Sequence, residues 1–254
     1  SRLPEIVGSL ATEHRVTSST PTRFIPDARP PRLQPNAAPL VLELLAAAES
    51  GRYDEAFVAT YDRAAAACAD QPDADLAFAI VNLKHSRTAE ARRLLERVAG
   101  RRPDEPSARL ALAWQNGLTR RYDDSLTHLR AAAEHLPVGP EHAQPADEAW
   151  ALSAAGLIGT CCGFATASGS EVGWSDVDLA AFETLAAGWP EPVAEAYRTA
   201  KGQVIERHAM LAAERDASEG ASRDRLTQQL GRLGAFGELD LATWRERVRT
   251  HLTD

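Results

Sequence analysis

Cysteine is scarce in this chain of 254 residues, and its pattern excludes several classes of protein. Cys68 stands alone, whereas Cys161 and Cys162 are adjacent. An odd count with two neighbouring cysteines argues against a secreted disulfide framework. Zinc would need a Cys-x2-Cys spacing or a nearby histidine pair, and neither is present. We therefore expect buried free thiols, no metal site and no cofactor, and free thiols favour a cytoplasmic location.

Net positive charge and long apolar runs are also missing. The formal charge is −8 and the isoelectric point is about 5.4. Nucleic acids and anionic membranes select clustered positive charge, so we expect neither as a partner. No run approaches the roughly 18 apolar residues of a spanning helix, so we expect no membrane insertion. Lysine occurs only at positions 84 and 201, and the arginine excess indicates a high-GC, bacterial genome.

Catalytic signatures are missing as well. The sequence contains no His-Glu-x2-His, no Gly-x4-Gly-Lys-Ser/Thr and no Gly-x-Ser-x-Gly. The spaced glycines between residues 163 and 173 follow no predicted strand and lack a lysine. His128, His135 and His142 recur every seven residues, but a metal-binding pair on a helix is best placed four residues apart. We therefore expect no catalytic and no metal-binding residues, and no enzymatic activity.

What the sequence does contain is a repeat. Alanine is abundant and β-branched residues are sparse, which favours helix over sheet. Within residues 72–139 one pattern recurs after 34 residues, as Ala91, Leu95, Val98 and Pro103 and then as Ser125, Leu129, Ala132 and Pro137. A small residue lets two helices approach, apolar residues fill the groove between them, and proline ends the second helix. The pattern predicts stacked helical hairpins.

These spacings resemble the tetratricopeptide repeat (TPR) family. The second helix of that repeat carries a small residue, an apolar residue four later and a closing proline, with a tyrosine at the turn before it. Tyr122 and Tyr53 occupy this turn in two of the hairpins, and Thr88 replaces the tyrosine in the hairpin between them. The resemblance implies an all-α fold, a right-handed superhelical stack of hairpins.

Three segments follow from this reading. Residues 1–38 are rich in proline and read as a linker or tail, in which the apolar pair Phe24 and Ile25 either docks loosely on the first helix or serves as a ligand motif for another domain. Residues 39–190 hold the TPR-like repeats, and residues 191–254 form C-terminal helices that pack on and cap the solenoid. The chain begins with serine, so we expect a piece of a longer protein.

The resemblance is clearest over residues 72–139 and degenerate over residues 39–71 and 147–190, where a fourth repeat is expanded. Helical periodicity predicts the further elements. We expect helices over residues 39–50, 53–69, 147–165, 190–217 and 226–236, and a last helix after Asp240. Ser175 with Asp178 predicts a capping box, and residues 166–173 are expected to form a loop.

The resemblance also implies a binding surface, because the first helices of such repeats line a concave groove. Asn82 and Asn116 occupy equivalent first-helix positions, where asparagines can hold an extended peptide. An amide hydrogen bond between neighbouring repeats is an equal alternative. The predicted groove residues are Asn82, Lys84, Trp114, Asn116, Arg120 and Arg121, and their basic members favour an acidic peptide. Val41 and Leu45 make a lysine–asparagine–arginine carboxylate clamp doubtful.

Three functions stay open. The first is a protein-interaction module that binds a protein or peptide on its concave face. The second is a structural or regulatory segment of a larger enzyme or assembly that acts through self-association. The third is an enzyme whose pocket lies in the expanded repeat, around Trp150, Cys161, Cys162 and Trp174. The missing catalytic motifs rank the first above the others.

Overall fold

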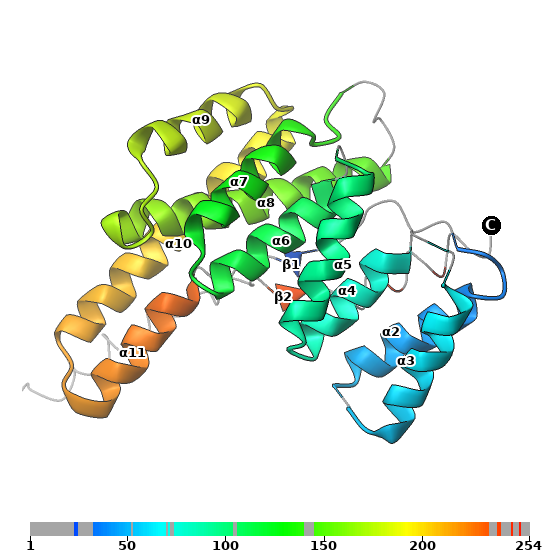
Figure 1. The fold of residues 1–254 in the computed structure, drawn as a ribbon. Helices are drawn as coiled ribbons and strands as arrows, with labels where there is room; N and C mark the ends of the chain where they lie inside the picture. Colours follow the sequence, from blue (N-terminus) through cyan, green and yellow to red (C-terminus); the bar gives the residue numbers. More distant parts are fainter. Residues whose placement is uncertain are drawn as a thin grey trace, which may run out of the picture.

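The computed structural model describes residues 23–24, 33–51, 53–69, 71, 74–103, 106–139, 145–233, 238–239, 245 and 249. Over these residues the chain is almost entirely α-helical, which confirms the predicted all-α class (Figure 1). The helix predicted after Asp240 and most of the proline-rich tail lie outside the described residues.

Three helical hairpins form the first layer of the fold. Their helices are α2 (Ala38–Glu49) with α3 (Glu55–Ala67), α4 (Ala74–Lys84) with α5 (Thr88–Arg101), and α6 (Pro106–Leu118) with α7 (Tyr122–Glu134). Helix α2 packs on α4 and α5 packs on α6, so neighbouring hairpins lie side by side. Asp54 caps α3 by accepting the Phe57 N–H at 2.9 Å, as a residue at this position does in many helices. These helices lie where the periodicity predicts them.

The sequence repeat is also a repeat of backbone geometry. Ser86 and Arg120 lie 34 residues apart, and both have positive φ, 59° and 58°. The N–H of the following residue donates to the carbonyl of Asn82 in one turn and of Asn116 in the other, each at 2.8 Å. This is the Schellman arrangement that ends a helix. The turns from α4 to α5 and from α6 to α7 are therefore equivalent.

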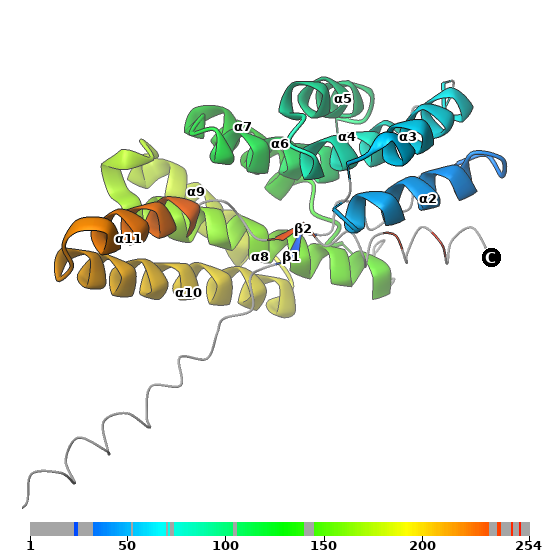
Figure 2. The ribbon, with the colours of Figure 1, turned by 90° about the horizontal axis from the view of Figure 1, so that it is seen from below.

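A second layer follows the hairpins. It contains α8 (Pro145–Ser168), the short 3₁₀ helix η2 (Gly169–Glu171), α9 (Asp176–Ala187), α10 (Glu191–Asp216) and α11 (Gly220–Leu233). Figure 2 shows α8 and α10 running beneath the hairpins. The capping box predicted for α9 is confirmed, since Asp178 N–H donates to Ser175 Oγ and Ser175 N–H to Asp178 Oδ2. The loop predicted from residue 166 begins later, because α8 continues to Ser168.

Helices α8 and α10 form the most extensive helix pair in the described part of the chain. Gly159 and Gly163 lie one turn apart on the face of α8 that meets α10. A Cβ atom at these positions would come within 2.2 Å of the Tyr197 carbonyl oxygen and 2.6 Å of the Lys201 carbonyl oxygen. The two backbones are therefore in direct contact, and only glycine permits this approach.

Within the described ranges, one helix is long and apolar enough to cross a membrane by length and composition alone, over Trp150–Glu171. Of its most apolar stretch, 72% is buried within the protein. The packing of this segment against α10 accounts for its composition, because a helix enclosed by its own chain is apolar on every side.

Two short strands were not predicted. Strand β1 (Arg23–Phe24) pairs in parallel with β2 (Glu238–Leu239), and β1 lies against α8. Figure 2 shows the pair beside α8, on the side that faces α4 and α6. Two residues are too few to carry an alternating pattern, so only the fold brings these segments together.

The first helices of the second and third hairpins are enclosed. All residues of α4 from Leu76 to Leu83 are buried, and α6 is buried except for the half-buried Arg109 and Trp114 and for Leu118, whose side chain is not described. The second layer and the strand pair lie on the inner side of these helices (Figure 2). Over these two hairpins the first helices therefore present no open face to a partner in this structure.

Candidate functional site

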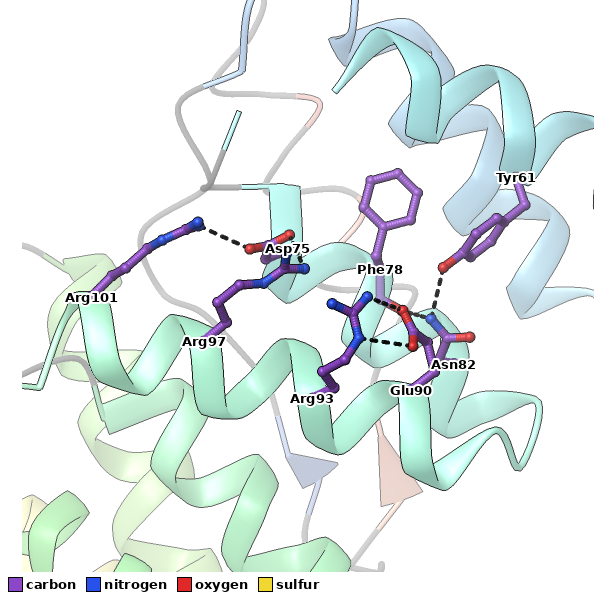
Figure 3. A network of polar contacts seen from close by, with 8 residues as sticks. All are labelled: Tyr61, Asp75, Phe78, Asn82, Glu90, Arg93, Arg97 and Arg101. Carbon is purple, nitrogen blue, oxygen red and sulfur yellow. Dashed lines mark hydrogen bonds and ion pairs between the residues drawn. The ribbon is translucent and has the colours of Figure 1, made fainter. Parts of the chain in front are cut away.

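The two predicted groove asparagines are buried, each with 1% of its surface exposed. Asn82 Nδ2 donates to the Tyr61 hydroxyl oxygen at 2.9 Å and to the Phe78 carbonyl at 2.8 Å (Figure 3). Tyr61 belongs to α3, so this amide joins the second hairpin to the first. The geometry is that of an amide hydrogen bond between neighbouring repeats.

Asn116 makes the equivalent connection one repeat later. Its Oδ1 accepts from Arg92 Nη2 at 2.8 Å, which joins α6 to the second helix of the preceding hairpin. Burial leaves neither Asn82 nor Asn116 a surface that a peptide can contact in this structure. Their role in holding a partner peptide stays a prediction that requires the hairpins to separate.

Replacing Asn82 by alanine is expected to reduce the free energy of unfolding by about 1–3 kcal/mol, because the buried amide would lose its hydrogen bonds to the half-buried Tyr61 hydroxyl and to the Phe78 carbonyl. Gln203→Ala is the matched control, since Gln203 is an exposed amide on α10, and its effect should stay within about 0.5 kcal/mol. Urea unfolding of the three proteins measures both values. Equal values for the two variants would show that the Asn82 amide does not hold the hairpins together.

The other predicted residues divide between the interior and one edge. Trp114 is half-buried and packs against the core, whereas Lys84, Arg120 and Arg121 are exposed. Because the two turns are equivalent, these three residues and Arg87 lie along the same edge of the hairpin layer, the lower edge in Figure 1. We call this the turn edge, and it consists of Lys84, Arg87, Arg120 and Arg121.

A hollow of about 420 Å³ adjoins the turn edge at the start of α7. Its walls come from the turn between α6 and α7 and from the turn after α8, as Arg120, Arg121, Tyr122, Asp123, Asp124, Ser170, Glu171, Val172 and Gly173. Trp174 Nε1–H donates to the Tyr122 carbonyl at 3.1 Å and holds the two walls together. The sequence indicated the insertion near residue 170 but not its contact with α7.

The charges around this hollow are mixed. Arg121 forms an ion pair with Asp124, whereas Arg120 has no ion pair among the described residues. Asp123 and Asp124 occupy the first turn of α7, where the helix dipole favours negative charge. A partner would therefore meet one unpaired guanidinium beside a carboxylate-rich helix end.

Three arginines of the second hairpin form ion pairs within that hairpin. The Asp75 carboxylate accepts from Arg97 Nη2 at 3.1 Å and from Arg101 Nη1 at 3.0 Å, and Glu90 pairs with Arg93 (Figure 3). The Asp75 contacts connect α4 with α5. The spacing of these residues, 22 to 26 apart, gave no sequence signal for the pairing.

The adjacent cysteines, Cys161 and Cys162, are part of the core between α8 and α10. Cys68, Cys161 and Cys162 are all free and buried, as predicted. Burial raises the pKa of the Cys161 thiol well above its ordinary value, and it raises the pKa of Cys162 to about 12. A nucleophilic cysteine needs a lowered pKa and access to substrate, and these thiols have neither.

A polar chain leads from Cys162 to the surface. The Tyr197 hydroxyl lies next to Cys162 and donates to Glu183 Oε1 at 2.8 Å, and Lys201 forms an ion pair with Glu183. These residues connect α8, α9 and α10. Burial and the neighbouring Cys162 and Glu183 raise the pKa of the fully buried Tyr197, so this hydroxyl remains protonated and serves packing.

The histidines do not assemble into a metal site. Among the residues that the structure describes, no three histidine, cysteine or carboxylate side chains are placed to hold an ion. His128 is half-buried, with its Nδ1 atom 3.5 Å from Arg109 Nη1. Burial and the Arg109 charge lower the pKa of His128. His135 is exposed, and His142 lies outside the described residues.

The chain was compared with known families, proteins and structures. No family model, curated protein or solved structure matches the chain. The resemblance to TPR repeats therefore rests on the repeated residues and on the repeated turn geometry.

Proposed function

We propose that this chain is a TPR-like helical-repeat module that binds a protein partner, and that the turn edge forms part of its binding surface. One observation carries the proposal. The 34-residue period of the sequence recurs as two equivalent positive-φ turns, and each turn presents two exposed cations, Lys84 with Arg87 and Arg120 with Arg121. Arg87 and Arg121 are one 34-residue repeat apart, and cations at the spacing of the hairpins suit a partner segment that runs across the stack.

The chemistry of the turn edge favours an acidic segment of the partner. Guanidinium and ammonium groups bind carboxylates through charge-assisted hydrogen bonds. The chain as a whole carries a charge of −8, so a locally basic edge orients an acidic partner and the rest of the surface repels it. Exposed charge pairs are screened by salt, and binding at this edge should weaken as ionic strength rises.

The scaffold beneath the turn edge supports this use. The buried Asn82 and Asn116 amides connect neighbouring hairpins close to the two turns, so the turns rest on fixed contacts. Binding residues placed on loops above a rigid scaffold are common in proteins, because the scaffold fixes their geometry before the partner arrives. A partner at this edge needs no access to the enclosed inner helices.

Binding of a fluorescein-labelled octaglutamate peptide, followed by fluorescence anisotropy, tests the proposal. We expect the full chain to bind the peptide at low salt, and the variant R120E/R121E to bind it about tenfold more weakly. The variant R223E/R225E is the matched control, because it changes the same charge on the exposed face of α11.

The control decides what a loss of binding means. Equal losses in both variants would show attraction to overall charge and would overturn the turn edge as a site. A wild-type chain that does not bind the peptide would overturn recognition of an acidic segment. Far-UV circular dichroism of each variant confirms that the helices are retained.

A further inference from the structure

A second hollow lies on the outer side of α3 and has a different character. It measures about 510 Å³ and is lined by Tyr53, Asp54, Glu55, Val58, Ala59 and Asp62. Tyr53 is 56% exposed and Val58 is 42% exposed, and only four large apolar side chains are exposed to this degree in the described part of the chain. Exposed apolar side chains gathered in a hollow are typical of a binding surface.

The rim of this hollow is acidic. Asp54 is engaged in capping α3, whereas Glu55 and Asp62 form no ion pair among the described residues. Among the residues that the structure describes, no basic side chain lines the hollow. An occupant must therefore supply positive charge around an apolar contact.

The complementary charge lies on the next hairpin. From α2 to the end of α3 the described residues include five acidic side chains and one basic side chain, whereas α4 and α5 with their turn include three acidic and six basic ones. The Tyr53 and His85 rings have centroids 5.1 Å apart. His85 lies in the α4–α5 turn between Lys84 and Arg87, so the acidic hollow and a basic part of the turn edge are neighbours.

We propose that the hollow receives a second copy of this chain, with Lys84 and Arg87 of each copy at the acidic hollow of the other. A two-fold axis close to Tyr53 and His85 would exchange the two patches and satisfy both at once. The inference rests on the proposed function, because Lys84 and Arg87 belong to the turn edge, and it names a partner for that edge.

A second copy fits better than an unrelated basic segment. An unrelated basic segment would neutralise Glu55 and Asp62 and leave Lys84 and Arg87 of the same face without a partner. The two-fold arrangement pairs both sets of charges and covers the exposed Tyr53 and Val58 side chains. Because most of the attraction is between exposed charges, the dimer should be weak and sensitive to salt.

Sedimentation velocity of the full chain tests this inference. We expect a monomer–dimer equilibrium at about 0.05 M NaCl, with the dimer lost at about 0.5 M NaCl. The variants E55K/D62K and K84E/R87E should each be monomeric at low salt, because like charges then face each other. An equimolar mixture of the two variants should form a heterodimer, since both of its contacts again pair opposite charges, reversed at one contact and native at the other.

Two controls test whether a loss of the dimer is specific to the two charged patches. The variant E206K/E214K changes the same charge at exposed positions of α10 and should dimerise like the wild type. Arg87 lies with its guanidinium 5.6 Å from the centroid of the Tyr61 ring, so K84E alone is measured beside the double variant in case the double variant loses helicity. K84E should weaken the dimer and keep the circular dichroism spectrum of the wild type.

A chain that stays monomeric at every concentration and at low salt would overturn the inference. So would a dimer that survives the charge reversals, or variants that do not associate with each other when mixed. A monomer that still binds octaglutamate leaves the proposed function standing while self-docking fails. A dimer that obeys the charge reversals but ignores octaglutamate supports self-docking and overturns recognition of an acidic segment.

Discussion

Gly159→Ala is expected to lower the free energy of unfolding by about 3 kcal/mol or more, one of the largest effects of any single methyl group in this protein. The added Cβ would lie 2.2 Å from the Tyr197 carbonyl oxygen, far inside the contact distance of the two atoms. The obstacle is backbone, so no side-chain rotation can relieve it, and α8 and α10 must move apart. Gly163→Ala should behave alike, because its Cβ would lie 2.6 Å from the Lys201 carbonyl oxygen.

Gly202→Ala is the matched control for this prediction. Gly202 lies within α10 with no heavy atom near its missing Cβ, so alanine should stabilise the helix by about 0.5–1 kcal/mol. Urea unfolding followed by circular dichroism measures all three variants. If Gly159→Ala lies within about 1 kcal/mol of the wild type, the close contact of the two helices is not real.

Separating α8 from α10 should also disturb the contact between α10 and α9. Tyr197 is fully buried at the contact, and its hydroxyl holds Glu183 of α9. A shift of the α10 backbone would move this hydroxyl away from both Glu183 and Cys162. The glycine pair therefore supports the polar chain as well as the packing.

Leu95→Ala and Leu129→Ala are each expected to cost about 2–5 kcal/mol of unfolding free energy. Both leucines are fully buried, in α5 and α7, at positions one repeat apart. Alanine would remove three side-chain carbon atoms, and the surrounding helices can close the resulting cavity only in part. Because the hairpins are equivalent, the two losses should be similar in size.

Val177→Ala is a suitable reference, because Val177 is 77% exposed and should change stability by no more than about 0.5 kcal/mol. Thermal and urea unfolding of the three variants provide the comparison. A large loss for one leucine and a small loss for the other would show that the two hairpins share a sequence pattern without sharing a packing.

The helices and their ends could be predicted from the sequence because their signals are local. Apolar residues at helical spacing, prolines at the ends of second helices and the Ser175–Asp178 pair each act within a few residues. The free, buried thiols were likewise predicted, from the odd number of cysteines and from the lack of a metal-binding spacing. These are properties that a segment carries wherever it is placed.

The candidate site could be predicted only in part. Lys84, Arg120 and Arg121 were identified from charge and repeat position, and they do lie exposed at one edge. Asn82 and Asn116 have the same repeat signal, but it cannot distinguish a polar residue that faces a groove from one that faces the neighbouring hairpin. The acidic hollow was missed, because Tyr53 was read only as a turn tyrosine of the repeat.

The sequence by itself determined that this chain folds into helical hairpins with a 34-residue period, since hydrophobic spacing, capping and proline act along the chain. Only the tertiary structure decided that α8 lies beneath the hairpins and that the inner helices are enclosed. It also decided which arginines form ion pairs and with which carboxylates. These outcomes depend on contacts between residues far apart in sequence, and such contacts leave no periodic trace in either partner.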